Sequence, residues 1–280
     1  MENRILRDFI LRSLDEDLGN GDHSSLASIP ADTTGKAKLL IKEKGILAGI
    51  RISEELFSTI DKDLKTDILL KDGANIAPGD IAFYVEGSTH SILKSERLVL
   101  NIMQRMSGIA TSTNEYVTRI KGLNAKILDT RKTTPGFRFL EKEAVRIGGG
   151  MNHRMGLYDM IMLKDNHIDY AGGIEKAITK TRDYLLKRNL NLKIEIEARN
   201  IKDIETILSI GGIDRIMLDN FSTDDTRKAV KMISGRYETE SSGGITLDTI
   251  RSYAECGVDY ISVGALTHHI KSLDMSLKAI

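Results

Sequence analysis

Residues 127–136 read ILDTRKTTPG, and residues 160–167 read MIMLKDNH. Each stretch begins with a short apolar run of the kind that forms a buried strand, and each then turns polar at once. A Pro-Gly pair stops any regular element soon after the first run. Arg131, Lys132 and Lys164 therefore follow two buried strands at their C-terminal ends. Because arginine offers a rigid fork and lysine a point charge to carboxylates and phosphates, the pattern predicts an anion-binding site.

Strands and helices alternate from residue 125 to the end of the chain. Candidate strands cover residues 126–129, 160–163, 192–197, 215–219, 237–241 and 260–263. Candidate helices cover residues 139–147, 173–186, 201–209, 224–233 and 247–255. Such alternation gives parallel strands with right-handed crossovers. A complete eight-stranded barrel typically takes ~250 residues, so this part of the chain predicts an incomplete α/β barrel.

The first hundred residues follow another pattern. Helical spacing of apolar residues predicts helices over 3–18 and 53–60. Strands are expected at 36–41, 46–50, 67–70, 80–86 and 88–93. A helix followed by clustered strands favours a separate α+β layer over a βαβ series.

A long apolar stripe predicts a further helix that begins at Ser95, a good N-cap, and runs to about residue 120. Arg97 then lies in the first turn, where the positive end of the helix dipole disfavours a cation. This placement suggests that Arg97 is used elsewhere.

Composition excludes several classes of protein. The 280 residues hold 40 basic and 40 acidic side chains, and this balance argues against a nucleic-acid partner. The single cysteine, Cys256, cannot form an internal disulfide, so we expect a reducing, cytoplasmic setting. The acidic N-terminal segment is unlike a signal peptide, and no apolar run approaches the ~18 residues of a membrane span.

Polar residues also end the later strands. Glu197 and Asp219 close two of them, the triplet 242–244 reads SGG, and Gly264 follows the sixth. In α/β barrels this end of the sheet is the catalytic face. Glycines there let backbone N–H groups approach a phosphate, although Ser-Gly-Gly alone is more often a turn.

Three segments together resemble the quinolinate phosphoribosyltransferase family, also called carboxylating nicotinate-nucleotide pyrophosphorylase. They are DTRKTTPG at 129–136, GGGMNHR at 148–154 and KDNH at 164–167. The resemblance implies transfer of phosphoribosyl from phosphoribosyl pyrophosphate to quinolinate, giving nicotinate mononucleotide, pyrophosphate and CO2 in NAD biosynthesis. It implies an N-terminal α+β sandwich domain at 1–110 and an open six-stranded parallel α/β barrel at 111–267 that carries the phosphoribosyl site. The family's last helix folds back on the N-terminal domain, a place that the tail 268–280 would take.

The resemblance also implies the site residues. The quinolinate set is Arg97, Thr130, Arg131, Lys132, His153, Arg154 and Lys164. The phosphoribosyl and phosphate set is Lys132, Lys164, Glu197, Asp219, Ser242, Gly243, Gly244 and Gly264. Lys132, Glu197 and Asp219 would be catalytic. The two carboxylates would act by stabilising oxocarbenium character at the ribose.

Cofactor and assembly follow from the same resemblance. Mg²⁺ would be held by pyrophosphate and water, with Glu197 and Asp219 as candidate protein ligands. A homodimer is expected in which Arg97 completes the partner's site. Glu195, on the same strand face as Glu197, is interpreted as structural.

Two alternatives stay open at this point. A paralogue could keep the phosphoribosyl site but use another aromatic acid or serve molybdate metabolism. A non-catalytic phosphate-binding barrel could act as a sensor, which would explain a phosphate loop but not the paired carboxylates Glu197 and Asp219.

Overall fold

The computed structural model describes residues 2–280 and divides them into two compact units. Unit 1 holds the chain up to Ser112 together with Pro135–Gly148 and Ile270–Ile280. Unit 2 holds Thr113–Thr134 and Gly149–His269. The division expected from the sequence, 1–110 and 111–267, places Pro135–Gly148 in the barrel, whereas this segment groups with unit 1 in the structure.

Unit 1 is built on an antiparallel sheet with the strand order β12-β1-β5-β3. Its strands are β1 (Thr34–Ile41), β3 (Lys65–Ile68), β5 (Ile81–Ser88) and β12 (Met275–Ala279). A small second sheet pairs β2 (Gly45–Ile46) with β4 (Asn75–Ile76). The helices are α1 (Glu2–Leu18), α2 (His23–Ser28), α3 (Ile50–Ile60), α5 (Arg138–Ile147) and the part of α4 (Thr89–Arg119) up to Ser112.

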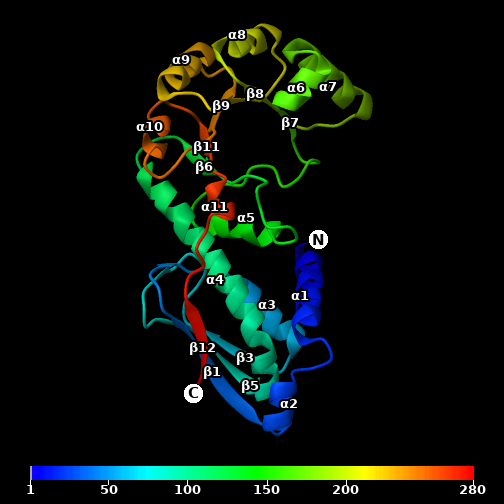
Figure 1. The fold of residues 1–280 in the computed structure, drawn as a ribbon, viewed down its shortest axis with the longest axis vertical. Helices are drawn as coiled ribbons and strands as arrows, with labels where there is room; N and C mark the ends of the chain where they lie inside the picture. Colours follow the sequence, from blue (N-terminus) through cyan, green and yellow to red (C-terminus); the bar gives the residue numbers. More distant parts are fainter. Residues whose placement is uncertain (1) are drawn as a thin grey trace. The chain divides into compact units, whose positions relative to one another are not determined.

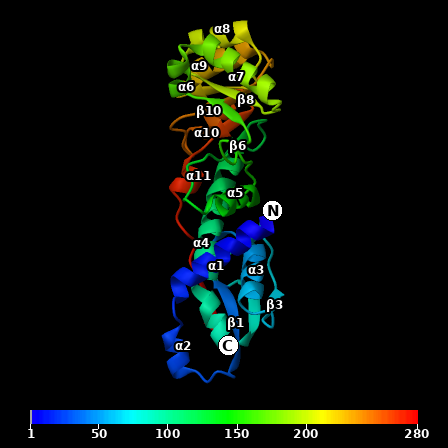
Figure 2. The same ribbon diagram turned by 90° about the vertical axis from the view of Figure 1, so that its right-hand side faces the viewer.

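The core of unit 1 is apolar. Alternation along β1 buries Leu39 and Ile41, and α3 packs on the sheet where the ring of Phe57 meets that of Phe83 edge-on, with centroids 5.7 Å apart. Helices α1 and α3 lie side by side in both views (Figures 1 and 2). Phe9 of α1 contacts Phe137 and Phe139 at ring-centroid distances of 5.6 and 5.7 Å. These contacts explain why α5 belongs to unit 1 and not to the barrel.

The expected strand at 88–93 is wrong, and so is the N-cap at Ser95. Helix α4 begins at Thr89, because Ile92 is buried one turn before Ser95 and extends the apolar stripe backward. The hydroxyl of Ser95 donates to the carbonyl of Ile92 at 2.6 Å inside the helix. Arg97 therefore lies beyond the first turn, and the dipole argument for its function fails.

The expected tail helix is also wrong. Residues Ala265–His268 form a short helix, α11, and the tail then becomes strand β12. β12 pairs antiparallel with β1, from Ala37 opposite Ala279 to Ile41 opposite Met275. The physical reason is a period of two: Met275 and Leu277 are buried and Ser276 is not, which suits a strand that covers a sheet edge.

Unit 2 confirms the predicted open, six-stranded parallel sheet, with the order β6-β11-β10-β9-β8-β7. The strands are β6 (Lys126–Leu128), β7 (Ile161–Leu163), β8 (Ile194–Ala198), β9 (Arg215–Asp219), β10 (Glu238–Ser242) and β11 (Tyr260–Ser262). The helices are α6 (Asp165–Ala171), α7 (Ile174–Arg188), α8 (Ile201–Ile210), α9 (Thr223–Ile233) and α10 (Ile250–Ala254). These helices lie outside the arc of strands (Figure 1).

The interior face of the barrel is charged. All five residues of β8 are buried, but Ile194, Ile196 and Ala198 alternate with Glu195 and Glu197. In the register of the sheet Glu195 lies opposite Arg215 of β9. Barrel interiors are usually filled by branched apolar side chains, so a charged interior indicates a use beyond packing. Among the described residues, no helix is both long and apolar enough to cross a membrane.

Candidate active site

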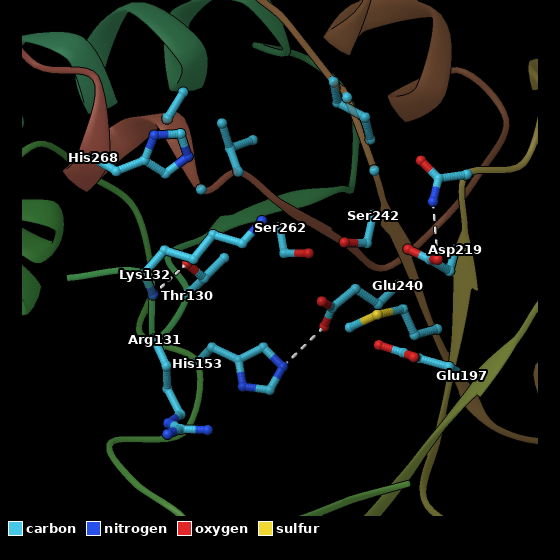
Figure 3. A pocket seen from close by; sticks show the side chains of 18 of the residues that line it. Thr130, Arg131, Lys132, His153, Glu197, Asp219, Glu240, Ser242, Ser262 and His268 are labelled. Atoms are coloured by element: carbon cyan, nitrogen blue, oxygen red, sulfur yellow. Dashed lines mark hydrogen bonds and ion pairs between the residues drawn. The ribbon is translucent and has the colours of Figure 1, made fainter. Parts of the chain in front are cut away.

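A cavity of about 730 Å³ opens at the C-terminal ends of the unit 2 strands. Of the residues proposed from the sequence, the cavity is lined by Thr130, Arg131, Lys132, His153, Arg154, Lys164, Glu197, Asp219, Ser242, Gly243, Gly244 and Gly264. Arg97 is exposed on α4 and is not one of the lining residues. In Figure 3 the cationic loop 130–132 and His153 lie on one side, and Glu197 and Asp219 lie on the other.

The loop after β6 is held in place by backbone hydrogen bonds. The N–H of Lys132 donates to the hydroxyl of Thr130 at 3.0 Å. The hydroxyl of Thr267 in α11 donates to the carbonyl of Lys132 at 2.7 Å. A Cβ at Gly264 would lie 3.0 Å from Cδ of Lys132, so glycine leaves room for this side chain. The lysine is thus fixed between the ends of β6 and β11.

Asp129 positions the second cationic segment. It is fully buried, and its carboxylate accepts the N–H of His153 at 2.8 Å and the side-chain amide of Asn152. The guanidinium of Arg154 donates to the carbonyl of Met160 at 3.0 Å. Burial and the charge of Arg131 lower the pKa of Arg154. Two guanidinium groups that repel each other at one wall are stabilised when an anion binds between them.

Lys164 and Glu197 form a close ion pair, with Nζ 2.5 Å from Oε1. The other oxygen of Glu197 accepts the N–H of Asp165 at 3.0 Å. Burial and the charge of Glu197 raise the pKa of Asp219. The two carboxylates are therefore close enough to repel, which favours a positive charge placed between them.

The Ser-Gly-Gly triplet begins at the last residue of β10 and is hydrogen-bonded to the residue that follows β9. Gly243 and Gly244 have φ of 99° and 60°, in the left-handed region. The N–H of Asn220 donates to the carbonyl of Ser242 at 2.9 Å, and a Cβ on Gly243 would fall on the side-chain amide of Asn220. Only glycine fits this close turn, which brings backbone to the rim of the cavity.

Sequence reasoning missed Glu240 and interpreted Glu195 as structural; the structure buries both beside His153. Nε2 of His153 lies 3.0 Å from Oε2 of Glu195 and 3.5 Å from Oε2 of Glu240. Arg215 places Nη1 2.9 Å from Oε2 of Glu240 and 3.9 Å from Oε2 of Glu195. Both glutamates have no exposed surface, and Glu240 lines the cavity. The alternation of Glu238 and Glu240 along β10 was the signal that could have found this cluster.

The comparisons with known proteins agree with this geometry. The model of the quinolinate phosphoribosyl transferase C-terminal domain matches residues 109–278, and that of the N-terminal domain matches residues 22–107. The chain belongs to the quinolinate phosphoribosyltransferase family.

Relatives of this phosphoribosyltransferase are similar over nearly its whole length. It is 44% identical to quinolinate phosphoribosyltransferase (decarboxylating) 2b, mitochondrial, from Nicotiana tabacum, over 98% of this chain and 82% of that protein. It is 43% identical to the probable nicotinate-nucleotide pyrophosphorylase (carboxylating) of Bacillus subtilis, over 98% of this chain and 92% of that one. The crystal structure of NadC from Streptococcus pyogenes is similar with a TM-score of 0.92 and 40% identity, over 97% of this chain and 94% of that chain.

Proposed function

We propose that this protein transfers the phosphoribosyl group of phosphoribosyl pyrophosphate to quinolinate with loss of CO2. The products are nicotinate mononucleotide and pyrophosphate, on the route to NAD. The observation that carries the proposal is one cavity with cations on one wall and a pair of carboxylates on the other. Such a cavity suits a reaction in which an anionic acid attacks a carbon that develops positive charge.

The two walls have separate tasks. The two vicinal carboxylates of quinolinate are bound by Arg131 and Arg154, together with Thr130 and His153. These contacts orient the ring nitrogen for attack. Glu197 and Asp219 face the ribose carbon and stabilise its oxocarbenium character as pyrophosphate leaves.

The phosphates of the other substrate need their own contacts. The backbone of Ser242, Gly243 and Gly244, together with Gly264, forms the 5′-phosphate loop. Lys132 and Lys164 balance the charge of the substrates, and the side chain of Lys132 lies beside Gly264 of that loop.

Mg²⁺ fits this site as a ligand of pyrophosphate. Magnesium prefers oxygen ligands and keeps several waters, so one or two carboxylates are enough to hold it with a phosphate. Both oxygens of Glu197 already accept hydrogen bonds, from Lys164 and Asp165, whereas only one oxygen of Asp219 does, from Asn220. Asp219 is therefore the protein group that would hold the ion, which neutralises charge on the leaving pyrophosphate.

The test is product analysis with the purified protein. Quinolinate, phosphoribosyl pyrophosphate and Mg²⁺ should yield CO2, pyrophosphate and nicotinate mononucleotide in equal amounts. Nicotinate in place of quinolinate serves as the control, since it has one carboxylate for two guanidinium groups. Equal or better turnover of another aromatic acid would favour the paralogue, and binding of phosphate without turnover would favour a sensor.

We further propose a homodimer in which Arg97 completes the partner's acid site. Its exposure on α4 and its absence from the cavity lining are the reasons to assign it to another subunit. Arg97→Ala and Lys132→Ala should each be nearly inactive alone. In a mixed dimer one site carries both lesions and the other neither, so random reassortment should restore about a quarter of wild-type activity. No recovery in mixed dimers of verified composition would refute this assignment.

We assign the protein to a reducing compartment, the cytoplasm. Cys256 is buried, and its thiol contacts the carbonyls of Ser252 and Thr223. Burial raises the pKa of this thiol, which keeps it protonated and unreactive. Alkylation of the folded protein should therefore leave Cys256 unmodified.

A further inference from the structure

Asn220 adopts a backbone conformation that its place in the fold does not explain. Its φ is 55°, in the left-handed region, where a residue with a Cβ is strained. Among residues 2–280, the other non-glycine residues with a positive φ are Asn189 and Ser234, and each of them ends a helix, α7 or α9. Left-handed residues are common at helix C-termini. Asn220 instead follows strand β9 and lies exposed at the rim of the cavity.

Glycine would adopt the backbone conformation of Asn220 without strain. Asparagine tolerates the left-handed region less well than glycine, although better than most other residues. A strained residue beside a cavity therefore indicates that its side chain is used. The contacts of the Asn220 amide show what this use is.

The side-chain amide of Asn220 lies between a carboxylate and a glycine. Its Nδ2 donates to Oδ2 of Asp219 at 2.9 Å, the hydrogen bond drawn at Asp219 in Figure 3. Because an ionised carboxylate only accepts hydrogen bonds, the nitrogen of the amide faces Asp219 and its oxygen faces Gly243. A Cβ on Gly243 would lie 2.6 Å from Cγ of Asn220, so the two residues pack closely.

The main chain of Asn220 is fixed to the same turn. Its N–H donates to the carbonyl of Ser242 at 2.9 Å, which joins the end of β9 to the end of β10. A Cβ on Gly243 would also lie 2.9 Å from the backbone nitrogen of Asn220. Both the main chain and the amide of Asn220 are thus held against the turn at 242–244.

The hydrogen bond from Asn220 restricts the orientation of Asp219. A carboxylate can turn either of its oxygens towards the cavity, and the like charge of Glu197 opposes that of Asp219. By holding Oδ2, the amide leaves Oδ1 for the substrate. Substrates that fill the cavity exclude water, and a charge-assisted hydrogen bond then becomes stronger.

We propose that Asn220 is a positioning residue that fixes the carboxylate of Asp219 against the turn at 242–244, so that one oxygen stays directed at the ribose carbon. The proposal rests on the proposed function. Neither the acid-binding set nor the phosphate-binding set of residues includes Asn220. One side chain thereby joins the 5′-phosphate loop to a carboxylate that stabilises positive charge, and the two parts of the site share a support.

Asn220→Gly separates the side chain from the backbone. Glycine adopts a φ of 55° freely, so the melting temperature should stay within about 3 °C of wild type. The main-chain hydrogen bond to Ser242 remains, whereas the amide that holds Asp219 is lost. We expect kcat to fall by about 10-fold or more, as for the loss of one hydrogen bond to a charged group. The KM for quinolinate should stay within about twofold, because Asp219 acts on the ribose and not on the acid.

Asn220→Asp tests whether the N–H of the amide is required. Aspartate has the shape of asparagine and also tolerates a left-handed φ, but when ionised it offers no donor to Asp219. The value of kcat should fall at least as far as in Asn220→Gly. Wild-type kcat in Asn220→Asp would show that shape alone is sufficient, and the proposal would then be wrong.

Asn189→Gly is the matched control. Asn189 has a φ of 50°, close to that of Asn220, and ends α7 on the exposed surface. It does not line the cavity. The exchange is therefore the same in chemistry and in conformation, and kcat should stay within about twofold of wild type. An equal fall of kcat in the two glycine variants would overturn the assignment to Asn220.

A double-mutant cycle tests whether Asn220 acts through Asp219. Asp219→Ala removes the acceptor of the hydrogen bond, so adding Asn220→Gly should change the remaining rate of pyrophosphate release by less than about twofold. A role of Asn220 in the fold of the loop would instead lower the rate by the same factor in both backgrounds. Equal factors would therefore refute the positioning of Asp219.

Other results would also contradict the positioning role. One is an unchanged kcat in Asn220→Gly. Another is a rise in the KM for quinolinate as large as the fall in kcat, which would mean that the whole cavity is disturbed. Failure of both Asn220→Gly and Asn220→Asp to fold would assign a structural role to the residue. Wild-type protein that releases no pyrophosphate from the two substrates would instead refute the proposed function itself.

Discussion

The two units place their buried charges differently: unit 1 carries Glu141 and Lys142 on helix α5, whereas unit 2 carries Glu195 and Glu240 on strands of its barrel. Unit 1 fills the space between its sheet and helices with apolar groups, such as Phe57, Phe83 and Leu39, none of them more than 1% exposed. Unit 2 places Glu195 and Glu240 at 0% exposure inside its barrel. An apolar core gains free energy from burial, whereas a buried ionic cluster scarcely does. The difference indicates that the charges inside the barrel serve the reaction, whereas the apolar core of unit 1 serves stability.

The largest expected effect concerns the stability of the two cores. Arg215→Met should lower the free energy of unfolding by about 3–5 kcal/mol, because two buried carboxylates lose their cation. Phe83→Ala in unit 1 should cost a similar amount, about 3–5 kcal/mol, by leaving a cavity. Urea unfolding at pH 5 and pH 8 distinguishes the two: the Arg215 loss should shrink at the lower pH and the Phe83 loss should not. If the losses in unfolding free energy of the two variants changed equally with pH, the two cores would not differ in the way described.

The next effect concerns catalysis at the strand ends. Glu197→Gln and Asp219→Asn should each reduce kcat by about 100- to 1000-fold, since these groups act on charge that develops in the transition state. The KM for quinolinate should change far less. Asp224→Asn, on the exposed surface of α9, is the control. Full activity in both site variants at saturating Mg²⁺ would exclude the oxocarbenium role.

A smaller effect tests the cationic wall. Arg131→Lys keeps the charge but loses the planar fork, so the KM for quinolinate should rise about 10- to 100-fold, the equivalent of about 1.5–3 kcal/mol. The KM for phosphoribosyl pyrophosphate should be less affected. Steady-state kinetics with each substrate varied in turn make the comparison. An unchanged KM for quinolinate would remove Arg131 from the acid site.

The smallest effect is the pH dependence of wild-type stability. The folded state raises the pKa of Glu195 from 4.5 to about 7 and that of His153 from 6.5 to about 9, so it binds more protons than the unfolded state. This stabilisation is complete below the unfolded pKa values and is lost as pH rises through the folded ones. Between about pH 6 and 9, stability should fall by on the order of 1 kcal/mol per pH unit. Glu195→Gln should flatten the lower part of this decline; a decline of the same slope in that variant would exclude Glu195 as its source.

The sequence predicted the barrel well because most of its strands are short apolar runs that end in polar residues, although β10 (Glu238–Ser242) is polar throughout. The same signal located Arg131, Lys132, Lys164, Glu197 and Asp219, which line the cavity, whereas His153 and Arg154 came from the resemblance to the family. It failed where tertiary contacts override local pattern. Residues 138–147 look like any barrel helix, and the contacts of Phe9 with Phe137 and Phe139 are what assign them to unit 1. The alternation of Glu238 and Glu240 marks one face of β10, but it does not show that Glu240 is buried beside a histidine from a distant loop, so Glu240 was missed.

The order of synthesis decides when strand β12 can pair with β1. The edge of β1 that β12 covers is synthesised among the first residues, and Met275–Ala279 follows only after the whole of unit 2. On the ribosome, the backbone N–H and C=O groups at that edge of β1 therefore stay unpaired while more than two hundred further residues are added. An open strand edge is a template for pairing with other chains. Nascent chains that stall within the barrel should thus recruit chaperones or aggregate through β1, and a separate peptide with the sequence of residues 270–280 should suppress that aggregation.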